Sequence, residues 1–280
     1  MTHSVQLAGL DWNHPEISDA IRRALEEDVG PGDVTTEACV AAETSAKGFF
    51  LSREPLVVAG VELLDQIYQG GEVTLLSQSG EAVPAEAIFA RVSGSARRLL
   101  TLERTVLNFL QRLSGIASTA RRFVEAVEGT GCQVLDTRKT TPGLRRLEKL
   151  AVRAGGATNH RFGLYDAILI KNNHITAAGG VRQALDLARA QSLPIEIEVR
   201  SFAELDEALA AGATHLLLDN FSPSDVAAAC ARIAGQAKVE VSGGINLENV
   251  REYAESGADF VSAGAMTHSA QAVDISFRLE

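Results

Sequence analysis

The segment from Asp136 to Lys171 gathers positive charge in a chain that is otherwise acidic. It holds eight Lys and Arg side chains against three Asp and Glu side chains, whereas the 280-residue chain has a formal net charge of −10. Thr140, Thr141 and several glycines lie among these cations. Arg holds a planar carboxylate with two parallel hydrogen bonds, and free backbone N–H groups at a helix start bind anions. The segment therefore predicts a site for a small anionic substrate.

The "TTPG" stretch is typical of the start of a helix. Thr141 is expected to cap a helix whose first turn contains Pro142. The cations that follow share that helix with an apolar stripe of leucines, so a solvated face is the expected setting for most of them: Arg145, Arg146, Lys149 and Arg153. Arg138 and Lys139, which precede the helix, are the better candidates for binding.

From residue 133 onward, short β-branched runs alternate with alanine-rich amphipathic runs, a pattern typical of a parallel sheet covered by helices. Ser and Asn at the starts of several helical runs and Gly at their ends support these boundaries. We expect six βα units, two short of an eightfold barrel. The expected strands cover residues 133–136, 166–171, 194–199, 214–219, 238–244 and 258–264.

Polar residues recur at the carboxyl ends of these strands, where α/β proteins bind ligands. Lys171, Glu198 and Asp219 follow one another at roughly one βα unit, so they are expected on one rim. The last two strands end in the glycine-containing turns Ser242–Gly244 and Ala263–Gly264, which suit phosphate. Carboxylates suit Mg²⁺, which keeps waters and bridges to substrate oxygens. The rim predicts a phosphorylated substrate and a divalent metal.

Glu198 has a further argument in its favour. Glu196 lies two residues earlier, so in a strand both side chains point to the same face. A pair of inward carboxylates is costly unless a cation meets it. For any single charged strand end, a salt bridge or a solvated position is the commoner explanation.

The first part of the chain has a different pattern. Strand-like runs surround one short helix at residues 61–69, which indicates an α+β domain. A long helical stretch over residues 101–129, expected to break near Gly115, joins it to the βα region. We place the domain boundary near residue 112, which gives an α+β domain over 1–112 and a βα domain over 113–280. The C-terminal tail is a candidate to pack on the N-terminal domain.

Composition excludes several classes of protein. A hydrophobic content of 46% can fill a substantial core, and the acidic balance argues against a nucleic-acid or membrane-surface binder. Three separated cysteines, Cys39, Cys132 and Cys230, show no zinc spacing and fit a reducing compartment. Residues 1–16 lack a basic region followed by an apolar run. We expect a cytoplasmic protein without a leader.

These motifs together resemble the quinolinate phosphoribosyltransferases, the carboxylating nicotinate-nucleotide pyrophosphorylases. The resemblance spans nearly the whole chain and is carried by "EDVGPGDVTT", "ERTVLNFLQRLSGIAS", "DTRKTTPGLR", "AVRAGGATNHRFGLYDAILIKNNH", "IEIEV", "LLLDN", "VSGGIN" and "DISFRLE". It implies an N-terminal α/β sandwich over 1–112, a truncated six-stranded α/β barrel over 113–280 that forms the catalytic domain, and a homodimer, with higher oligomers left open. It also implies a Mg²⁺-dependent reaction in NAD biosynthesis, in which quinolinate and phosphoribosyl pyrophosphate give nicotinate mononucleotide, pyrophosphate and CO₂.

The resemblance also implies roles for individual residues. Lys139, Glu198 and Asp219 are the expected catalytic residues, and the two carboxylates are the expected metal site, directly or through substrate and water. Arg104 is expected to reach the neighbouring subunit's site, so that active sites are shared across the dimer. The expected substrate-binding residues are Arg104, Thr137, Arg138, Lys139, His160, Arg161, Lys171, Glu198, Asp219, Ser242, Gly243, Gly244, Ala263 and Gly264.

Other functions stay open on the sequence alone. One is a sibling transferase that uses nicotinate and does not decarboxylate, and another is a molybdenum-associated homologue. The number of cations around "TRK" and "NHR" favours a dicarboxylate over a monocarboxylate. A third alternative is a phosphate-binding barrel that senses a metabolite, but such a module has little use for two carboxylate strand ends.

Overall fold

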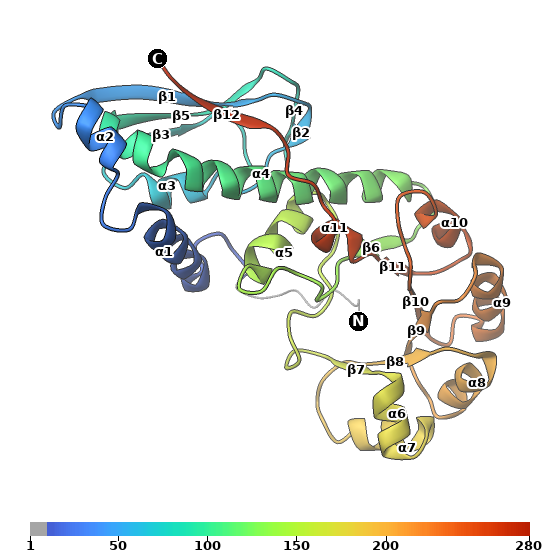
Figure 1. Ribbon diagram of the computed structural model, residues 1–280. Coiled ribbons are helices and arrows are strands. Elements are labelled where there is room, and N and C mark those ends of the chain that lie inside the picture. Colours follow the sequence, from blue (N-terminus) through green and yellow to red (C-terminus); the bar gives the residue numbers. More distant parts are fainter. Residues whose placement is uncertain (1–9) are drawn as a thin grey trace. The chain divides into compact units, whose positions relative to one another are not determined.

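The computed structural model describes residues 10–280, which divide into two compact units (Figure 1). The barrel unit contains residues 122–139 and 157–265, and the antiparallel-sheet unit contains the described residues up to 121 together with 140–156 and 266–280. The start of the chain, where no leader is expected, lies partly outside the described residues. Among residues 10–280, no helix is long and apolar enough to cross a membrane.

The antiparallel-sheet unit is built on a four-stranded sheet in the order β12-β1-β5-β3. The C-terminal strand pairs with β1, so that Phe277 lies opposite Phe50, and their tilted rings have centroids 4.9 Å apart. The short strands β2 (Leu56–Val57) and β4 (Ala82–Val83) form a separate pair. The sheet strands are β1 (Ser45–Ser52), β3 (Glu72–Leu75), β5 (Ile88–Ser95) and β12 (Ile275–Leu279).

The helices of this unit include one long helix and several short ones. The helix α4 (Ala96–Ala126) is continuous, so the expected break near Gly115 is wrong. Gly115 is required there because an added Cβ would lie 2.0 Å from the carbonyl oxygen of Gln271. The shorter helices are α1 (Pro15–Val29), α2 (Val34–Cys39), α3 (Leu63–Ile67), α5 (Arg145–Ala154) and α11 (Ala265–His268).

The barrel unit is a six-stranded, all-parallel sheet in the order β6-β11-β10-β9-β8-β7. All six expected strands form, and the fold class predicted from the sequence is confirmed. The strands are β6 (Gln133–Leu135), β7 (Ile168–Ile170), β8 (Ile195–Val199), β9 (His215–Asp219), β10 (Lys238–Ser242) and β11 (Phe260–Ser262).

Helices connect these strands, and two of them begin at serine caps that the sequence predicts. Ser201 and Ser222 accept backbone N–H groups of the first turns of α8 and α9, and Pro223 occupies the first position of α9. Figure 1 shows the helices following the strands around the outside of the sheet. They are α6 (Asn172–Ala178), α7 (Val181–Ala188), α8 (Phe202–Ala210), α9 (Pro223–Ile233) and α10 (Val250–Glu255).

Candidate active site

The carboxyl ends of the barrel strands bring the expected rim residues together. Asp219 ends β9 and is the register partner of Ser242, which ends β10. Glu198 lies one residue before the end of β8, opposite Leu217 of β9, and Lys171 follows β7 directly. Because all these strands are parallel, the side chains lie at the same edge of the sheet. The rim inferred from sequence spacing is therefore present.

A carboxylate pair and one cation dominate this edge. Lys171 Nζ lies 2.7 Å from Glu198 Oε2, and only 5% of Glu198 is exposed. Burial and the charge of Glu198 raise the pKa of Asp219, while Lys171 opposes that shift. Two carboxylates that repel each other in this way form a donor set that fits a divalent cation.

The turn after β10 contributes backbone groups beside the carboxylates. Gly243 and Gly244 have φ angles of 105° and 63°, and a Cβ on Gly243 would lie 2.3 Å from Asn220 Oδ1. Asn220, itself at φ 60°, donates its backbone N–H to Ser242. Glycine is thus required by both conformation and space. Ala263 and Gly264 follow β11, so they lie at the same carboxyl edge.

The cationic segment that follows β6 begins at Asp136, whose side chain is fully buried. Asp136 accepts the backbone N–H of His160 at 2.8 Å and the side-chain amide of Asn159 at 2.7 Å. Thr137 Oγ1 accepts the N–H of Lys139, whose side chain is exposed. Arg138 is half-buried. The buried Asp136 thereby links the "TRK" and "NHR" motifs, which are far apart in the sequence.

Arg161 is a buried cation with another cation as its neighbour. It is 7% exposed, and one guanidinium nitrogen donates to the carbonyl oxygen of Ala167 at 3.0 Å. Burial lowers the pKa of Arg161, and the charge of Arg138 lowers it further. An anion bound between two such arginines would relieve both costs. The arrangement suits a substrate carboxylate.

His160 lies between two buried carboxylates inside the barrel unit. Its Nε2 is 3.1 Å from Glu196 Oε2 and 3.4 Å from Glu240 Oε2. Burial opposes a charge on His160, but Glu240 and Glu196 outweigh burial and raise its pKa to about 10. Burial and the charge of Glu196 also raise the pKa of Glu240. The three side chains together therefore retain an extra proton at neutral pH.

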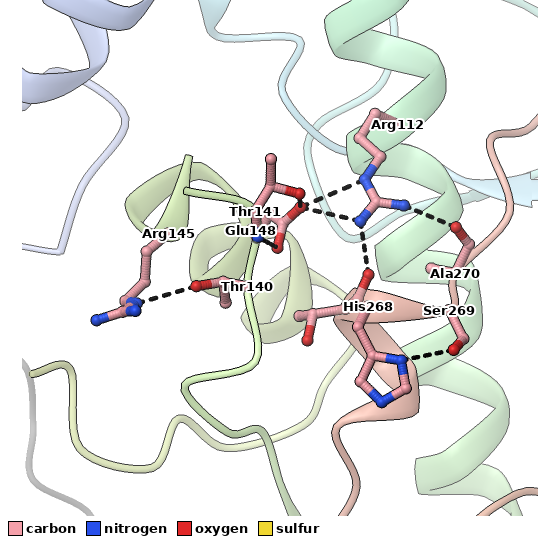
Figure 2. A network of polar contacts seen from close by, with 9 residues as sticks. Arg112, Thr140, Thr141, Arg145, Glu148, His268, Ser269 and Ala270 are labelled. Carbon is pink, nitrogen blue, oxygen red and sulfur yellow. Dashed lines mark hydrogen bonds and ion pairs between the residues drawn. The ribbon is translucent and has the colours of Figure 1, made fainter. Parts of the chain in front are cut away.

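A second polar cluster, in the antiparallel-sheet unit, fixes the "TTPG" loop (Figure 2). Glu148 is fully buried and accepts the Thr141 hydroxyl at 2.7 Å, the Thr141 N–H at 3.1 Å and Arg112 Nη2 at 3.0 Å. Arg112 also donates to the carbonyl oxygens of Thr267 and Ala270. This cluster joins α4, the loop, α11 and the segment that follows α11.

Two sequence interpretations of this region are wrong. Thr141 does not cap α5, because the helix begins at Arg145 and the Thr141 side chain is committed to Glu148. The α5 cations do not form a solvated face: Lys149 is fully buried, and Arg146 forms an ion pair with Glu16 at 3.0 Å. Arg145 Nε donates to Thr140, and Arg153, though exposed, donates to the Leu10 carbonyl.

Arg104 lies apart from the strand-end pattern. It is exposed on α4, in the antiparallel-sheet unit. The residues that sequence reasoning missed are Asp136, Glu148 and Glu240. Glu240 precedes Ser242 by two residues, just as Glu196 precedes Glu198, and this repeated spacing was the available signal.

Several known proteins are similar to this chain over most of its length. The family model "Quinolinate phosphoribosyl transferase, N-terminal domain" matches residues 33–114, and the corresponding C-terminal domain model matches residues 116–278. The nicotinate-nucleotide pyrophosphorylase (carboxylating) of Mycobacterium leprae is 44% identical over 273 residues, covering 93% of this chain and 96% of the relative. A probable nicotinate-nucleotide pyrophosphorylase (carboxylating) of Bacillus subtilis is 38% identical, with 94% and 93% covered.

A solved structure gives the same result for the fold. The nicotinate-nucleotide pyrophosphorylase from Francisella tularensis matches with a TM-score of 0.90 at 38% identity. The match covers 95% of this chain and 96% of that one.

Proposed function

We propose that this chain, which belongs to the quinolinate phosphoribosyl transferase family, transfers the phosphoribosyl group of phosphoribosyl pyrophosphate to quinolinate and then decarboxylates the product. The products are nicotinate mononucleotide, pyrophosphate and CO₂. The observation that carries the proposal is the division of the barrel unit between the cations of the "TRK" and "NHR" motifs, of which Arg161 is buried, and a carboxylate pair at the ends of β8 and β9. One part suits a dicarboxylate, and the other suits a phosphorylated sugar with a metal ion.

The cations hold and orient quinolinate in this proposal. Five side chains bind the two carboxylates and direct the ring nitrogen at the anomeric carbon: Arg138, Lys139, His160, Arg161 and the partner-derived Arg104. Positioning is the main contribution, because two oriented reactants no longer need to meet in solution. The ring nitrogen forms the new bond to the anomeric carbon, and pyrophosphate leaves with the electron pair of the bond that breaks.

Glu198 and Asp219 act on the phosphoribosyl side. Departure of pyrophosphate leaves positive charge on the ribose, which nearby carboxylates stabilise. The two carboxylates would also hold Mg²⁺, directly or through water, and this ion would neutralise charge on the pyrophosphate. Lys171, the Ser242–Gly244 turn and the Ala263–Gly264 turn supply cationic and N–H groups for phosphate.

Decarboxylation needs no additional group. Once alkylated, the ring nitrogen is cationic, so it stabilises the electron pair left on the adjacent carbon when CO₂ departs. That carbon then takes a proton. The CO₂ step therefore distinguishes this reaction from that of a nicotinate-using transferase.

The test is a product assay with two candidate substrates. Purified protein is incubated with phosphoribosyl pyrophosphate, Mg²⁺ and either quinolinate or nicotinate, and pyrophosphate and CO₂ are measured. We expect equal amounts of both products with quinolinate and little turnover of nicotinate. Pyrophosphate from nicotinate at a comparable rate contradicts the dicarboxylate assignment, and no pyrophosphate from either contradicts the transferase assignment. Omission of Mg²⁺ should abolish product formation.

The proposal includes a homodimer with shared active sites in the cytoplasm. Its support is Arg104, an exposed cation outside the strand-end pattern. Arg104→Ala and Lys139→Ala homodimers should each be nearly inactive, whereas subunit exchange should build hybrids with one intact site. Verified exchange without recovered activity would show that Arg104 does not act across the interface.

A further inference from the structure

Asn220, which follows Asp219 at the end of β9, has a backbone conformation that few residues adopt. Within residues 10–280 it is one of three residues other than glycine with a positive φ angle, and its φ is 60°. Asparagine tolerates this left-handed region better than most residues because its side chain is short and polar. The Asn220 backbone N–H donates to the carbonyl oxygen of Ser242 at 2.9 Å, so the end of β9 is tied to the end of β10.

The two polar atoms of the Asn220 side chain contact two different parts of the barrel rim. Nδ2 donates a hydrogen bond to Asp219 Oδ2 at 3.0 Å. Oδ1 lies against Gly243, since a Cβ added to that glycine would be 2.3 Å from Oδ1 and 2.8 Å from Cγ of Asn220. One side chain therefore contacts both the carboxylate that ends β9 and the glycine turn that follows β10.

The glycine turn has a second support that does not involve Asp219. Asn249 Nδ2 donates to the carbonyl oxygen of Gly244 at 3.0 Å. Asn249 Oδ1 accepts the backbone N–H of Asn246 at 2.8 Å, which fixes the orientation of the amide. Asn249 thus supports the turn, whereas Asn220 supports both the turn and the carboxylate.

We propose that Asn220 is a positioning residue that holds Asp219 and the Ser242–Gly244 turn in fixed relative positions for phosphoribosyl pyrophosphate. In the proposed function, on which this inference rests, the carboxylate serves the ribose and its metal ion while the turn serves a phosphate of the same molecule. Both can act on one substrate molecule only if their relative placement matches it. A misplacement of about 1 Å can cost roughly a hundredfold in rate.

Two simpler explanations of Asn220 are local. In one, asparagine is present because it tolerates the left-handed backbone, and in the other it fills the space beside Gly243. Glycine satisfies the first explanation, and aspartate satisfies both, because it has nearly the same shape and also tolerates this conformation. Neither replacement offers the amide group that contacts Asp219. The two variants therefore separate positioning from conformation and packing.

The kinetic test compares Asn220→Gly and Asn220→Asp with phosphoribosyl pyrophosphate as the varied substrate. We expect kcat/KM for this substrate to fall about tenfold in both variants, the effect of losing one hydrogen bond to a carboxylate, with a change of less than about twofold in the KM for quinolinate. Wild-type kinetics of Asn220→Asp would mean that shape alone is required, and wild-type kinetics of Asn220→Gly that conformation alone is. Either result, or equal losses for both substrates, overturns the proposal.

Ala234→Gly is the matched control for the backbone. Ala234 is an exposed residue of the same unit with a φ of 49°, so glycine relieves the same kind of conformation away from the rim. Its kinetics should equal those of the wild type. A loss like that of Asn220→Gly would show that glycine itself lowers activity, and would overturn the inference from Asn220.

A double-mutant cycle tests whether Asn220 acts through Asp219. Affinity for phosphoribosyl pyrophosphate with Mg²⁺ is measured by calorimetry, so that the result does not depend on turnover. In the Asp219→Ala background, Asn220→Gly should cost less affinity than it does in the wild type, whereas Asn249→Ala should cost the same in both. An equal cost of Asn220→Gly in the two backgrounds would mean that Asn220 does not act through Asp219.

A measurement without substrate tests the same contact independently of the reaction. Amide hydrogen exchange at residues 242–244 should be faster in Asn220→Gly than in the wild type, while exchange in β6 and β7 stays unchanged and shows that the fold is intact. Unchanged exchange at the turn would overturn the inference. Failure of the proposed function has a different signature, because the wild-type protein would then release no pyrophosphate while the exchange difference at the turn remained.

Discussion

Glu148 and Glu240 are both buried carboxylates, but the two units of the molecule surround them differently. In the antiparallel-sheet unit, Glu148 accepts from the backbone and hydroxyl of Thr141 and from Arg112. In the barrel unit, Glu240 has His160 at 3.4 Å and the charge of Glu196 nearby. Glu148 therefore has hydrogen-bond donors for both carboxylate oxygens. Glu240 is buried beside a like charge, which costs free energy.

The difference separates groups that stabilise the fold from groups that serve the site. A buried carboxylate with several donors, one of them cationic, links chain segments and is costly to break. A carboxylate that repels a neighbour and lacks donors weakens the fold locally, and it is retained where ligand binding benefits. Asp219 and Glu198 also repel each other at the barrel rim, although Lys171 meets Glu198 there at 2.7 Å.

The largest expected effect is a loss of turnover when Glu198 or Asp219 at the barrel rim is replaced. Glu198→Gln and Asp219→Asn should each lower turnover by roughly 10²- to 10³-fold, because charge at the reacting centre is lost. Quinolinate binding without phosphoribosyl pyrophosphate should persist in calorimetry. Loss of quinolinate binding with an intact fold contradicts the assignment of these residues to the phosphoribosyl side.

Asp219→Asn should also leave stability unchanged or higher at neutral pH. The folded-state pKa of Asp219 is raised, so the folded protein binds this proton more tightly than the unfolded chain does. Ionisation of Asp219 therefore costs stability as pH rises above the unfolded value, and the amide removes that cost. Thermal unfolding at pH 4 and pH 7 checks this, and a marked fall in the unfolding temperature at pH 7 would oppose it.

Glu148→Ala should show the opposite behaviour. Removing the acid leaves Arg112 and Thr141 without their shared acceptor, and breaking such a buried ion pair costs about 3 kcal/mol. Urea unfolding measures this loss. The exposed Glu255, which pairs with Arg251 on one helix, provides the control, because Glu255→Ala should cost about 0.5 kcal/mol or less. Equal losses of unfolding free energy for the two variants would mean that the buried ion pair contributes no more than the exposed one.

The sequence predicted the barrel rim well because the signal there is local. Each strand is a short apolar run, and parallel strands must bring their carboxyl ends to one edge, so Lys171, Glu198 and Asp219 could be grouped from spacing alone. The same argument required a cation for the inward pair of glutamates. In the structure Lys171 meets Glu198 and His160 meets Glu196.

The clusters that the sequence did not predict depend on contacts between distant segments. The helix pattern around Glu148 predicts a solvated face, but the main partners of Glu148 are Arg112 on α4 and the Thr141 loop, which the pattern does not contain. Asp136 joins residues 24 positions away through its contact with His160. Helix periodicity says which face is apolar, but it does not say what packs against the polar face.

Substitutions of Arg138 should have an intermediate effect on quinolinate use. They also separate the contribution of the positive charge from that of the planar guanidinium geometry. Arg138→Ala should weaken quinolinate use about 10- to 150-fold, the equivalent of roughly 1.5–3 kcal/mol. Arg138→Lys should fail to restore it, because a point charge cannot form two parallel hydrogen bonds with a carboxylate. Steady-state kinetics with quinolinate as the varied substrate measure both. Full rescue by Lys would show that only the charge matters.

The smallest expected effect is a change in stability on replacing Gly115, where helix preference and a steric clash act in opposite directions. Replacing a helical glycine with alanine normally stabilises by about 1 kcal/mol. At Gly115, however, the new Cβ would lie 2.0 Å from the carbonyl oxygen of Gln271 and 3.2 Å from the Cα of Ala272. Backbone atoms cannot swing aside as a side chain does, and such overpacking costs about 1–3 kcal/mol.

We therefore expect Gly115→Ala to lower the free energy of unfolding by about 1 kcal/mol, since the clash outweighs the helix preference. The C-terminal segment that carries Gln271 leads into β12, so the strain should appear first as faster amide exchange at residues 275–279. Asn108→Ala is the control, an exposed position of the same helix where alanine should gain a few tenths of a kcal/mol. A stabilised Gly115→Ala protein with unchanged exchange in β12 would mean that the backbone at 271–272 yields at little cost.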